Sequence, residues 1–481
     1  MEGLLIPEDK DYATDMALAT DFYELTMAAA YYFSNNYGDR DFASKKNAIF
    51  ELFVRKLPAN RAYIVTAGLE QALYFLANVK FNQKHVAYLK SLDVFKHLGE
   101  DFFEYVTRFR FTGTVWAVPE GTILFPNEPI MRVEAPIIEA QIVETVLLST
   151  INFQSLIATK ASRIVSSAMG KDVVEFGSRR AHGVQAGLLA ARAAYIGGCV
   201  GTSNSLAGYK LGIPVFGTMA HSYIMNFERE EEALQQFSKV FPGSFLLVDT
   251  YDSIAAVKKI IRLGIKMKGI RLDSGDIYQL SVECRKLLDS APNCSNTKIM
   301  ASGDLNEYLI RDLIRKGAPI DTFGVGTELS TSRDDPTMNG VYKLVAIRLQ
   351  GSMNDAKNGT KRKLSHDTLL FKLKTSPGKK TYPGPKQIYR ILENKKIIRD
   401  WIMLEDEGQI PTGLAIPLLK KQFEKGKLLC KLPSIAEIQS YHIRQLDLLP
   451  SQFRDLDFKP KEFPVFISEK LKRITKQFRP A

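Results

Sequence analysis

The sequence of 481 residues has few of the features that indicate metal-centred or covalent chemistry. Only four cysteines occur, with no CxxC pair and no histidine at metal-binding spacing, so neither a disulfide framework nor a structural zinc site is indicated. They are Cys199, Cys284, Cys294 and Cys430. The GxxxxGKS/T nucleotide loop, the HExxH zinc motif, the GxSxG elbow and the protein-kinase signature are also absent. Any use of ATP therefore requires another kind of site.

Long uninterrupted apolar runs are missing as well. The longest apolar stretches, residues 135–153 and 186–199, contain charged and amide side chains, whereas a membrane span needs about 20 apolar residues. Residues 1–10 have neither the basic region nor the apolar core of a signal peptide. We therefore expect a folded protein without a membrane partner and with a cytoplasmic location. A composition of 45% hydrophobic and 25% charged residues is ordinary for such proteins.

The net charge of +12 comes largely from two segments, residues 357–380 and 459–479. Charge runs of this kind are usually solvated faces of a folded protein. Positive potential also suits small substrates that carry several phosphates. Because Lys and Arg that neutralise phosphates dominate the affinity for nucleic acid, a nucleic-acid-binding protein is an alternative from a different class. The interleaving of aromatic and basic residues typical of an RNA-recognition strand is missing.

Six apolar, β-branched runs in the middle of the chain end abruptly in glycine, acidic or hydroxyl residues. Each is followed by a helix-like stretch, at the spacing of a strand-helix unit. The runs are residues 173–180, 213–221, 245–250, 269–276, 298–304 and 321–327. Gly264 and Gly317 stand where helices of such units end. This rhythm predicts a parallel α/β barrel, in which the polar residues at the carboxyl ends of the strands converge on one pocket.

The chain before this repeat has a different pattern. Helices are expected over residues 20–33 and 66–76, and strands over residues 47–56, 111–122 and 129–135. This region is therefore mixed α+β. We predict three parts: residues 1–138 as the first part of a mixed domain, 139–345 as the α/β barrel with the active site, and 346–481 as the second part of the mixed domain with a basic extension.

Two groups of residues at the predicted strand ends can carry chemistry. His221 follows Gly217 and Thr218, where a histidine can act as a base or be phosphorylated, or can simply be satisfied by loop hydrogen bonds. Asp273 and Asp276 flank a glycine turn. Such carboxylates can hold a magnesium-bound diphosphate through water, stabilise a developing cation, or cap a helix.

Phosphate-binding turns and fixed cations complete the predicted pocket. The segments 302–304 and 324–327 resemble turns in which backbone N–H groups meet an anion, although glycine turns end most barrel strands. Arg179, Arg180 and Arg271 can donate bidentate hydrogen bonds to carboxylate or phosphate groups, or form surface ion pairs.

The order and spacing of eight short segments closely resemble those of nicotinate phosphoribosyltransferases. These segments are residues 20–27, 50–55, 175–181, 217–222, 271–276, 324–327, 340–345 and 432–437. The resemblance implies a type II phosphoribosyltransferase, with an irregular parallel α/β barrel joined to a mixed sandwich domain from the early and late chain. It also implies a homodimer with shared active sites. The implied reaction transfers phosphoribose from phosphoribosyl pyrophosphate to nicotinate, coupled to ATP hydrolysis with Mg²⁺, in NAD salvage.

The resemblance also assigns roles to particular residues. His221 matches the histidine that ATP phosphorylates, and Asp273 is placed to stabilise the sugar cation. Nicotinate is expected to contact Tyr23, Thr218 and Arg271. Phosphoribosyl pyrophosphate is expected at Arg179, Asp276, Gly303, Asp304, Gly326 and Thr327. Asp304 lies in a stretch that varies among relatives.

Related enzymes are the nearest alternatives. Nicotinamide phosphoribosyltransferases resemble one another in carrying an acid near the ring amide, and Asn204 matches that place here. A neutral residue there avoids repelling the carboxylate of nicotinate, so Asn204 is a further candidate contact. A quinolinate enzyme would need more basic residues for its second ring carboxylate. An aldolase-type barrel would need a Schiff-base lysine at a strand end, and the six ends contain none.

Overall fold

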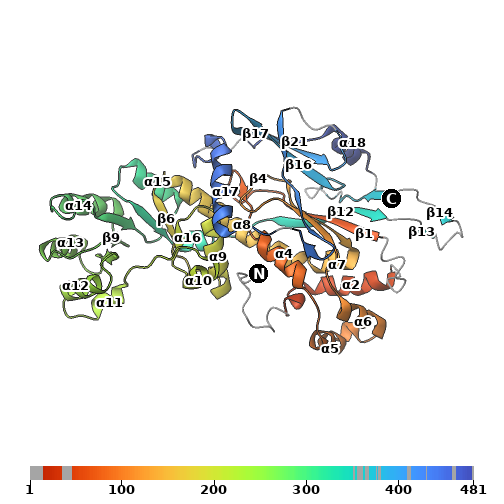
Figure 1. Cartoon of the computed structure of the whole chain (residues 1–481), viewed down its shortest axis with the longest axis horizontal. Coiled ribbons are helices and arrows are strands. Elements are labelled where there is room, and N and C mark those ends of the chain that lie inside the picture. The colour runs from red at the N-terminus through yellow and green to blue at the C-terminus, as the bar shows by residue number, and fades with distance from the viewer. Residues whose placement is uncertain are drawn as a thin grey trace.

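The computed structural model describes residues 15–34, 46–349, 353–354, 361–362, 368–374, 376, 381–408, 413–429, 431–457 and 462–478, so Cys430 and much of both basic segments lie outside it. A parallel sheet lies on one side of the long helix α8 (Glu144–Ser167), and an antiparallel sheet lies on the other (Figure 1). This arrangement separates a barrel lobe from a sandwich lobe, with α17 (Ile435–Leu448) crossing near their junction.

The barrel lobe contains six parallel strands in the order β7-β6-β11-β10-β9-β8. They are β6 (Asp172–Glu175), β7 (Gly201–Thr202), β8 (Phe245–Leu247), β9 (Gly269–Leu272), β10 (Lys298–Ala301) and β11 (Thr322–Val325). Among the described residues no ladder joins β7 to β8, so the barrel is irregular, as expected. Five of the six predicted runs form strands. The run at residues 213–221 does not, because Pro214 has no N–H to donate and the segment forms only the bridge between Val215 and Thr202.

Helices follow the strands in the predicted way. They are α9 (Val184–Ile196), α10 (Ser205–Leu211), α11 (His221–Met225), α12 (Glu230–Val240), α13 (Ser253–Arg262), α14 (Ile277–Asp289), α15 (Glu307–Arg315) and α16 (Thr327–Ser330). Gly264 and Gly317 end α13 and α15 with φ angles of 59° and 74°. The left-handed conformation favours glycine at such a position, which confirms both predicted helix ends.

The sandwich lobe is assembled from the two ends of the chain, as the resemblance implied. Its seven-stranded sheet has the order β15-β12-β1-β5-β3-β19-β20 and is antiparallel throughout. The strands are β1 (Lys46–Val54), β3 (Thr114–Ala117), β5 (Pro129–Pro136), β12 (Gly340–Leu349), β15 (Thr368–Phe371), β19 (Lys420–Glu424) and β20 (Lys427–Leu428). The predicted domain boundaries stay a prediction, with one of them falling inside β12.

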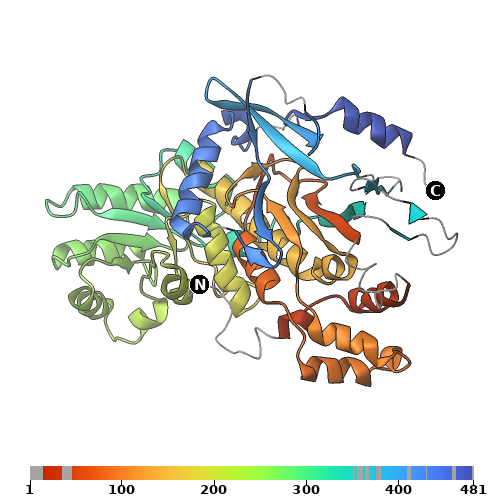
Figure 2. The same ribbon diagram turned by 45° about the vertical axis from the view of Figure 1, so that its right-hand side comes forward.

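A four-stranded sheet with the order β18-β16-β17-β21 lies beside the seven-stranded one (Figure 2). It consists of β16 (Lys386–Glu393), β17 (Lys396–Leu404), β18 (Leu414–Pro417) and β21 (Val465–Ile467), with α18 (Glu469–Gln477) against it. Two short pairs complete the strands, β2 (Ile64–Val65) with β4 (Ile123–Leu124) and β13 (Met353–Asn354) with β14 (Lys361–Arg362).

The helices of the early chain include the two predicted over residues 20–33 and 66–76, and further helices that were not predicted, among them those at residues 83–91 and 100–108. They are α2 (Phe22–Ser34), α4 (Leu69–Asn78), α5 (Gln83–Ser91), α6 (Glu100–Arg108) and α7 (Ile137–Ile142), with short 3₁₀ turns at Met16–Leu18, Asp93–Phe95 and, late in the chain, Ser451–Phe453. The helix expected over residues 66–76 begins only at Leu69. The reason is that Gly68 at its N-cap has a φ of 99°, which the body of a helix cannot accommodate.

The stretch Ile137–Ser167 corrects the expectation that no segment could span a membrane. Its most apolar window of 18 residues has a mean hydropathy of 1.3, so the stretch is long and apolar enough to do so by length and composition alone. In the fold, 61% of its most apolar window is buried. Helix α8 packs on α4, α9 and α15, and its residues belong to the apolar cores of both lobes. The apolarity of this stretch is therefore that of a core helix.

Candidate active site

The turns after the parallel strands follow one another in the order of the sheet. Because all six strands point the same way, their carboxyl ends lie at one edge. From β7 to β8 the turns carry Asn204, then Arg179, Gly326 with Thr327, Gly303 with Asp304, Asp273, and finally Asp249 with Thr250. Residues separated by more than a hundred positions in the sequence therefore form a single row.

Arg271 on β9 forms several of the hydrogen bonds that connect residues of this row. Its Nη1 donates a hydrogen bond to the Thr218 hydroxyl at 2.6 Å, and its Nη2 donates to Asp273 Oδ1 at 2.7 Å. Its Nε donates to the Ser302 hydroxyl at 2.9 Å. The guanidinium side chain is only 14% exposed. Arg271 therefore joins the segment before α11 to the ends of β9 and β10, and the predicted residues Thr218, Arg271 and Asp273 do come together.

Asp273 is held as a carboxylate by this network. Partial burial raises its pKa, but hydrogen bonds from Ser302 and Arg271 and the charge of Arg271 outweigh burial, so the pKa lies below its usual range. The backbone N–H of Asp273 donates to Asp249 Oδ2 at 3.2 Å, and Ser274 donates to the same oxygen at 2.6 Å. The other oxygen, Asp249 Oδ1, is buried without a hydrogen-bond partner in the described chain.

His221 is the first residue of α11 and lies beside the carboxylate. Its Nδ1 is 3.1 Å from the Thr250 hydroxyl, and its Nε2 is 4.0 Å from Asp273 Oδ2. The side chain is 41% exposed. One ring nitrogen is thus oriented by a hydroxyl, as a loop histidine would be, while the ring remains accessible to a ligand.

The turn after β10 packs directly on the turn after β9. Gly303 has a φ of 89°, and a Cβ placed there would lie 1.9 Å from the carbonyl oxygen of Asp273. Only glycine allows this approach. Asp304, which follows, also has a positive φ of 43°. In the next turn, Gly326 precedes Thr327, the first residue of α16.

Of three other predicted residues, two cap helices and one has a guanidinium without a hydrogen bond or ion pair to a described residue. Asp276 is the N-cap of α14 and accepts from the backbone of Gln279 at 3.0 Å, so the capping alternative holds for it. Asn204 caps α10 through its Oδ1, which leaves its amide nitrogen available. Arg179 is exposed in the turn after β6, and no hydrogen bond or ion pair of its guanidinium to a described residue is found.

Tyr23 lies far from this row within one chain. It belongs to α2, at the opposite end of the molecule from β9 and α11–α14 in both views (Figures 1 and 2). Its side chain is 45% exposed. Partial burial and the neighbouring carboxylates Glu144 and Glu24 raise the pKa of its hydroxyl. The fold of a single chain therefore does not bring Tyr23 to Arg271.

Several residues of the row were missed from the sequence. Asp249 and Thr250 are the last two residues of the predicted run 245–250. The rule that polar residues at strand ends converge on the pocket would have found them if it had been applied to this run. Ser302 was seen only as part of a glycine turn. Glu175 at the end of β6 is buried and accepts from Gly177 N and the Thr202 hydroxyl. Its burial raises its pKa, and its bonding indicates a structural role that no motif signals.

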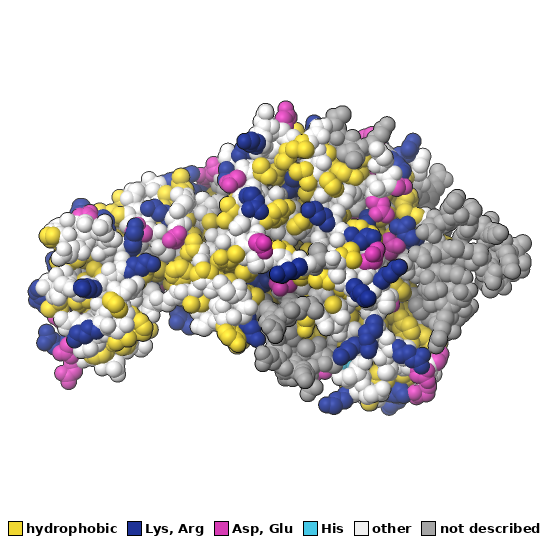
Figure 3. Space-filling model, in the orientation of Figure 1, with side chains coloured by type: hydrophobic (Ala, Val, Ile, Leu, Met, Phe, Trp, Pro, Cys, Tyr) yellow, Lys and Arg dark blue, Asp and Glu magenta, His cyan; other side chains and the backbone are white. Residues whose placement is uncertain are grey.

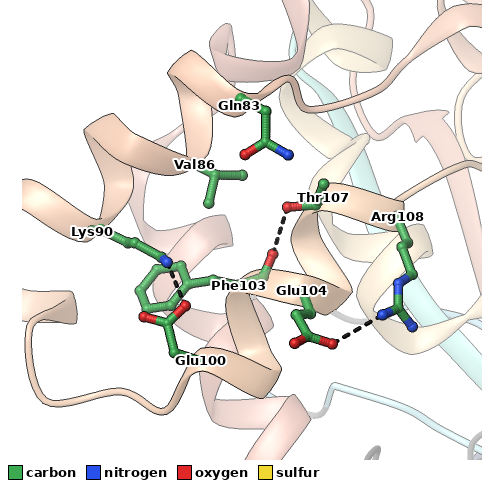
Figure 4. Close-up of a pocket in the computed structure, with 8 residues that line it drawn as sticks. All are labelled: Gln83, Val86, Lys90, Glu100, Phe103, Glu104, Thr107 and Arg108. Atoms are coloured by element: carbon green, nitrogen blue, oxygen red, sulfur yellow. Dashed lines mark hydrogen bonds and ion pairs between the residues drawn. The ribbon is translucent and has the colours of Figure 1, made fainter.

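Cavities lined by charged residues also lie away from the row. One cavity of about 290 Å³ lies between α5 and α6 (Figure 4). Its charges are already paired, Lys90 with Glu100 and Arg108 with Glu104. Lys and Arg are scattered over the face in Figure 3 rather than gathered into one stripe. The described part of this face therefore shows no single basic stripe.

The fold and the row of strand-end residues define a type II phosphoribosyltransferase, and the crystal structure of human nicotinic acid phosphoribosyltransferase matches with a TM-score of 0.76. That match has 27% sequence identity and covers 95% of this chain and 99% of the human one. A nicotinate-nucleotide pyrophosphorylase from Pyrococcus furiosus has the same fold, with a TM-score of 0.70 at 24% identity over 93% of this chain and 98% of its own.

Sequence comparison then identifies the family. The nicotinate phosphoribosyltransferase N-terminal domain matches residues 18–152, the nicotinate phosphoribosyltransferase family model matches residues 172–369, and the C-terminal domain matches residues 414–475. A nicotinate phosphoribosyltransferase of Mycobacterium tuberculosis is 39% identical over 95% of this chain and 92% of its own. That of Bacillus subtilis is 40% identical over 94% and 93%. The chain belongs to the nicotinate phosphoribosyltransferase family.

Proposed function

We propose that this protein transfers phosphoribose from phosphoribosyl pyrophosphate to nicotinate, giving nicotinate mononucleotide and pyrophosphate for NAD salvage. The observation that carries the proposal is the bonding of Arg271 to Thr218, Asp273 and Ser302 at the edge where the strand-end turns meet. Described residues accept four hydrogen bonds from Arg271, and a guanidinium has five N–H groups. The fifth, on Nη2, is available for the carboxylate of nicotinate.

The charges of the row suit the glycosyl step. Departure of pyrophosphate leaves positive charge on the anomeric carbon, so the protein needs to position the reactants and stabilise that charge. Asp273 is ionised and partly exposed, which suits it to face the cation. The turns at Gly303 and Gly326 and the exposed Arg179 are the groups proposed to hold the phosphates.

The donor set fits Mg²⁺ bound mainly by the substrate. In the described chain no group of three His, Cys, Asp or Glu side chains could hold a metal ion by itself. Mg²⁺ usually keeps several waters and binds through one or two carboxylates together with substrate phosphates. Asp249, with its unpartnered buried Oδ1, and Asp273 are the carboxylates placed for this. When bound, the ion would neutralise charge on the diphosphate leaving group.

We propose that His221 couples ATP hydrolysis to this reaction by accepting a phosphoryl group. Its accessible ring lies 4.0 Å from Asp273 Oδ2 and is oriented by Thr250. In this scheme the histidine takes no part in the glycosyl step. Its role belongs to energy coupling, and slow transfer without ATP should survive its loss.

We also propose a homodimer with shared sites. Helix α2 and strand β9 lie at opposite sides of the folded chain (Figure 1). If Tyr23 contacts the same nicotinate as Arg271, it therefore has to come from a second copy. Exposed apolar residues lie on α2 (Phe22, Tyr23 and Phe33) and around the row (Val184, Tyr209, Met225 and Tyr251). A second copy would cover both groups. A cytoplasmic location stays a prediction from the sequence.

The nicotinamide enzyme is the alternative that the site itself can test. Asn204 is neutral, and its Oδ1 is committed to the helix cap, so it presents an amide N–H and no negative charge. This favours an acid over an amide as the substrate. The deciding assay supplies purified protein with phosphoribosyl pyrophosphate, Mg²⁺ and either nicotinate or nicotinamide, with and without ATP. If mononucleotide forms with nicotinamide but not with nicotinate, the proposal is overturned.

A further inference from the structure

A buried lysine connects the two glycine turns proposed to hold phosphate. Lys160 is on the core helix α8, and its side chain is 1% exposed. Its Nζ lies 2.6 Å from Glu307 Oε2, 2.9 Å from Asp334 Oδ1 and 3.7 Å from Glu328 Oε2. A lysine is almost never fully buried unless it is paired, and here one ammonium group lies among three carboxylates.

The carboxylates belong to the segments that continue from the two turns. Glu307 is the first residue of α15, which follows the turn containing Gly303 and Asp304. Glu328 is in α16, directly after Thr327. Asp334 follows α16. A single ammonium group therefore bonds to the segment after β10 and to the segment after β11.

Arginines also pair with the carboxylates around Lys160. Arg61 donates to both oxygens of Asp334, at 2.7 and 2.9 Å, and Arg163 Nε donates to Glu307 Oε1 at 3.3 Å. The three carboxylates are thus paired with three buried cations, and the exposed Arg333 also lies 3.6 Å from Glu328 Oε1. Among the described residues, only Lys160 is within ion-pair distance of all three acids. Its removal would therefore take away one positive charge from each of them. These acids lie behind turns that are proposed to accept an anion.

We propose that Lys160 is a positioning residue for phosphoribosyl pyrophosphate. It holds the turns after β10 and β11 at a fixed separation and neutralises the acids behind them, so that both turns can bind the phosphates of one substrate. This inference rests on the proposed function. Lys160 itself contacts no substrate, because it is buried beneath the turns.

The test is Lys160→Met, which keeps the length of the side chain and removes its charge. We expect the KM for phosphoribosyl pyrophosphate to rise about ten-fold or more, because loss of one hydrogen bond to a charged phosphate weakens binding by about that factor. The KM for nicotinate at saturating phosphoribosyl pyrophosphate should change less than about two-fold. Lys160→Arg, which retains the charge, should restore part of the loss.

Arg192→Met is the matched control. Arg192 is a fully buried cation on α9 that pairs with Glu120 and Glu70, and none of its hydrogen-bond or ion-pair partners among the described residues belongs to either turn. Its loss should destabilise the fold without a selective effect on phosphoribosyl pyrophosphate. If Lys160→Met raises both KM values equally, or behaves as Arg192→Met does, the positioning role is overturned.

A milder variant keeps the test decisive if Lys160→Met does not fold. Glu328→Gln weakens the 3.7 Å contact with Lys160 and the 3.6 Å contact with the exposed Arg333, and it should raise the KM for phosphoribosyl pyrophosphate by a smaller factor. The shift of Tm on adding Mg²⁺ and phosphoribosyl pyrophosphate should be smaller in Glu328→Gln than in the wild type. An equal shift in both proteins overturns the role of Lys160. A wild type that shows no shift overturns the proposed function instead.

Discussion

Replacement of Arg271 by alanine tests the centre of the candidate site most directly. The change removes the donor proposed for the carboxylate of nicotinate and the bonds to Thr218 and Asp273. A hydrogen bond between charged groups contributes about 1.5 to 3 kcal/mol, which corresponds to about a ten- to hundred-fold loss of affinity. We therefore expect the KM for nicotinate to rise by about that factor, with a much smaller change for phosphoribosyl pyrophosphate.

The same substitution should alter the pH dependence. In the wild type, Ser302 and Arg271 keep the pKa of Asp273 below its usual range in spite of burial. Without Arg271, burial remains while one hydrogen bond and the favourable charge are lost, so the pKa of Asp273 should rise. Because the ionised carboxylate is the form proposed to stabilise the cation, activity in acid solution should then disappear at a higher pH than in the wild type. Measured profiles of kcat against pH would show this shift.

Two further variants make the result interpretable. Arg271→Lys keeps a charge but cannot form the same fork of bonds, so it should fall between the wild type and alanine. Arg262→Ala removes an exposed arginine of α13 whose partner is Glu231, and it should leave both KM values unchanged. A folded Arg271→Ala protein with an unchanged KM for nicotinate and an unchanged pH profile would refute the placement of nicotinate at this row.

Three other predictions can be checked with single variants. His221→Ala should abolish ATP stimulation and leave slow transfer without ATP, and labelled ATP should place phosphate on His221 of the wild type; full stimulation of the variant would contradict the coupling role. Asn204→Asp should lower kcat/KM for nicotinate relative to nicotinamide, since Asp can still cap α10 but adds a like charge; an unchanged ratio in a folded variant would show that residue 204 does not contact the ring. Burial raises the pKa of Glu139 from 4.5 to about 7, against hydrogen bonds from Thr112, so stability is greatest while Glu139 is protonated and is lost as the pH rises through about 7. The free energy of unfolding of Glu139→Gln relative to the wild type should therefore increase between pH 5 and pH 8, by up to about 3 kcal/mol at about 1.36 kcal/mol per pKa unit; a pH-independent difference in denaturant titrations would contradict this.

The repeat of strands and helices was accessible from the sequence because it depends on local patterns. An apolar run that ends at a glycine or an acid, followed by a helical period, has the same meaning in many folds. It located β6, β8, β9, β10 and β11 and the helix ends at Gly264 and Gly317. It failed at residues 213–221, where the local pattern is that of a strand but Pro214 and the edge position allow only one bridge.

The candidate site could be predicted from the sequence only in part. Strand ends predicted which polar residues could converge, and Thr218, Arg271, Asp273 and His221 do so. The same rule could not show that Asp276 caps a helix, since a carboxylate at a strand end and a carboxylate at a helix start occupy the same position in the sequence. Only the backbone geometry distinguishes the two roles.

The sequence by itself determined the class of fold, the family and the kinds of side chain available for chemistry, because these follow from short-range periodicity and from motifs of a few residues. The tertiary structure alone decided which of them meet. The contacts of Arg271 with Thr218 and of Lys160 with Glu307 join residues that are distant in the chain. Their partners are selected by sheet order and helix packing, which no local pattern contains. For the same reason, the separation of Tyr23 from Arg271 became visible only once the two lobes were placed on either side of α8.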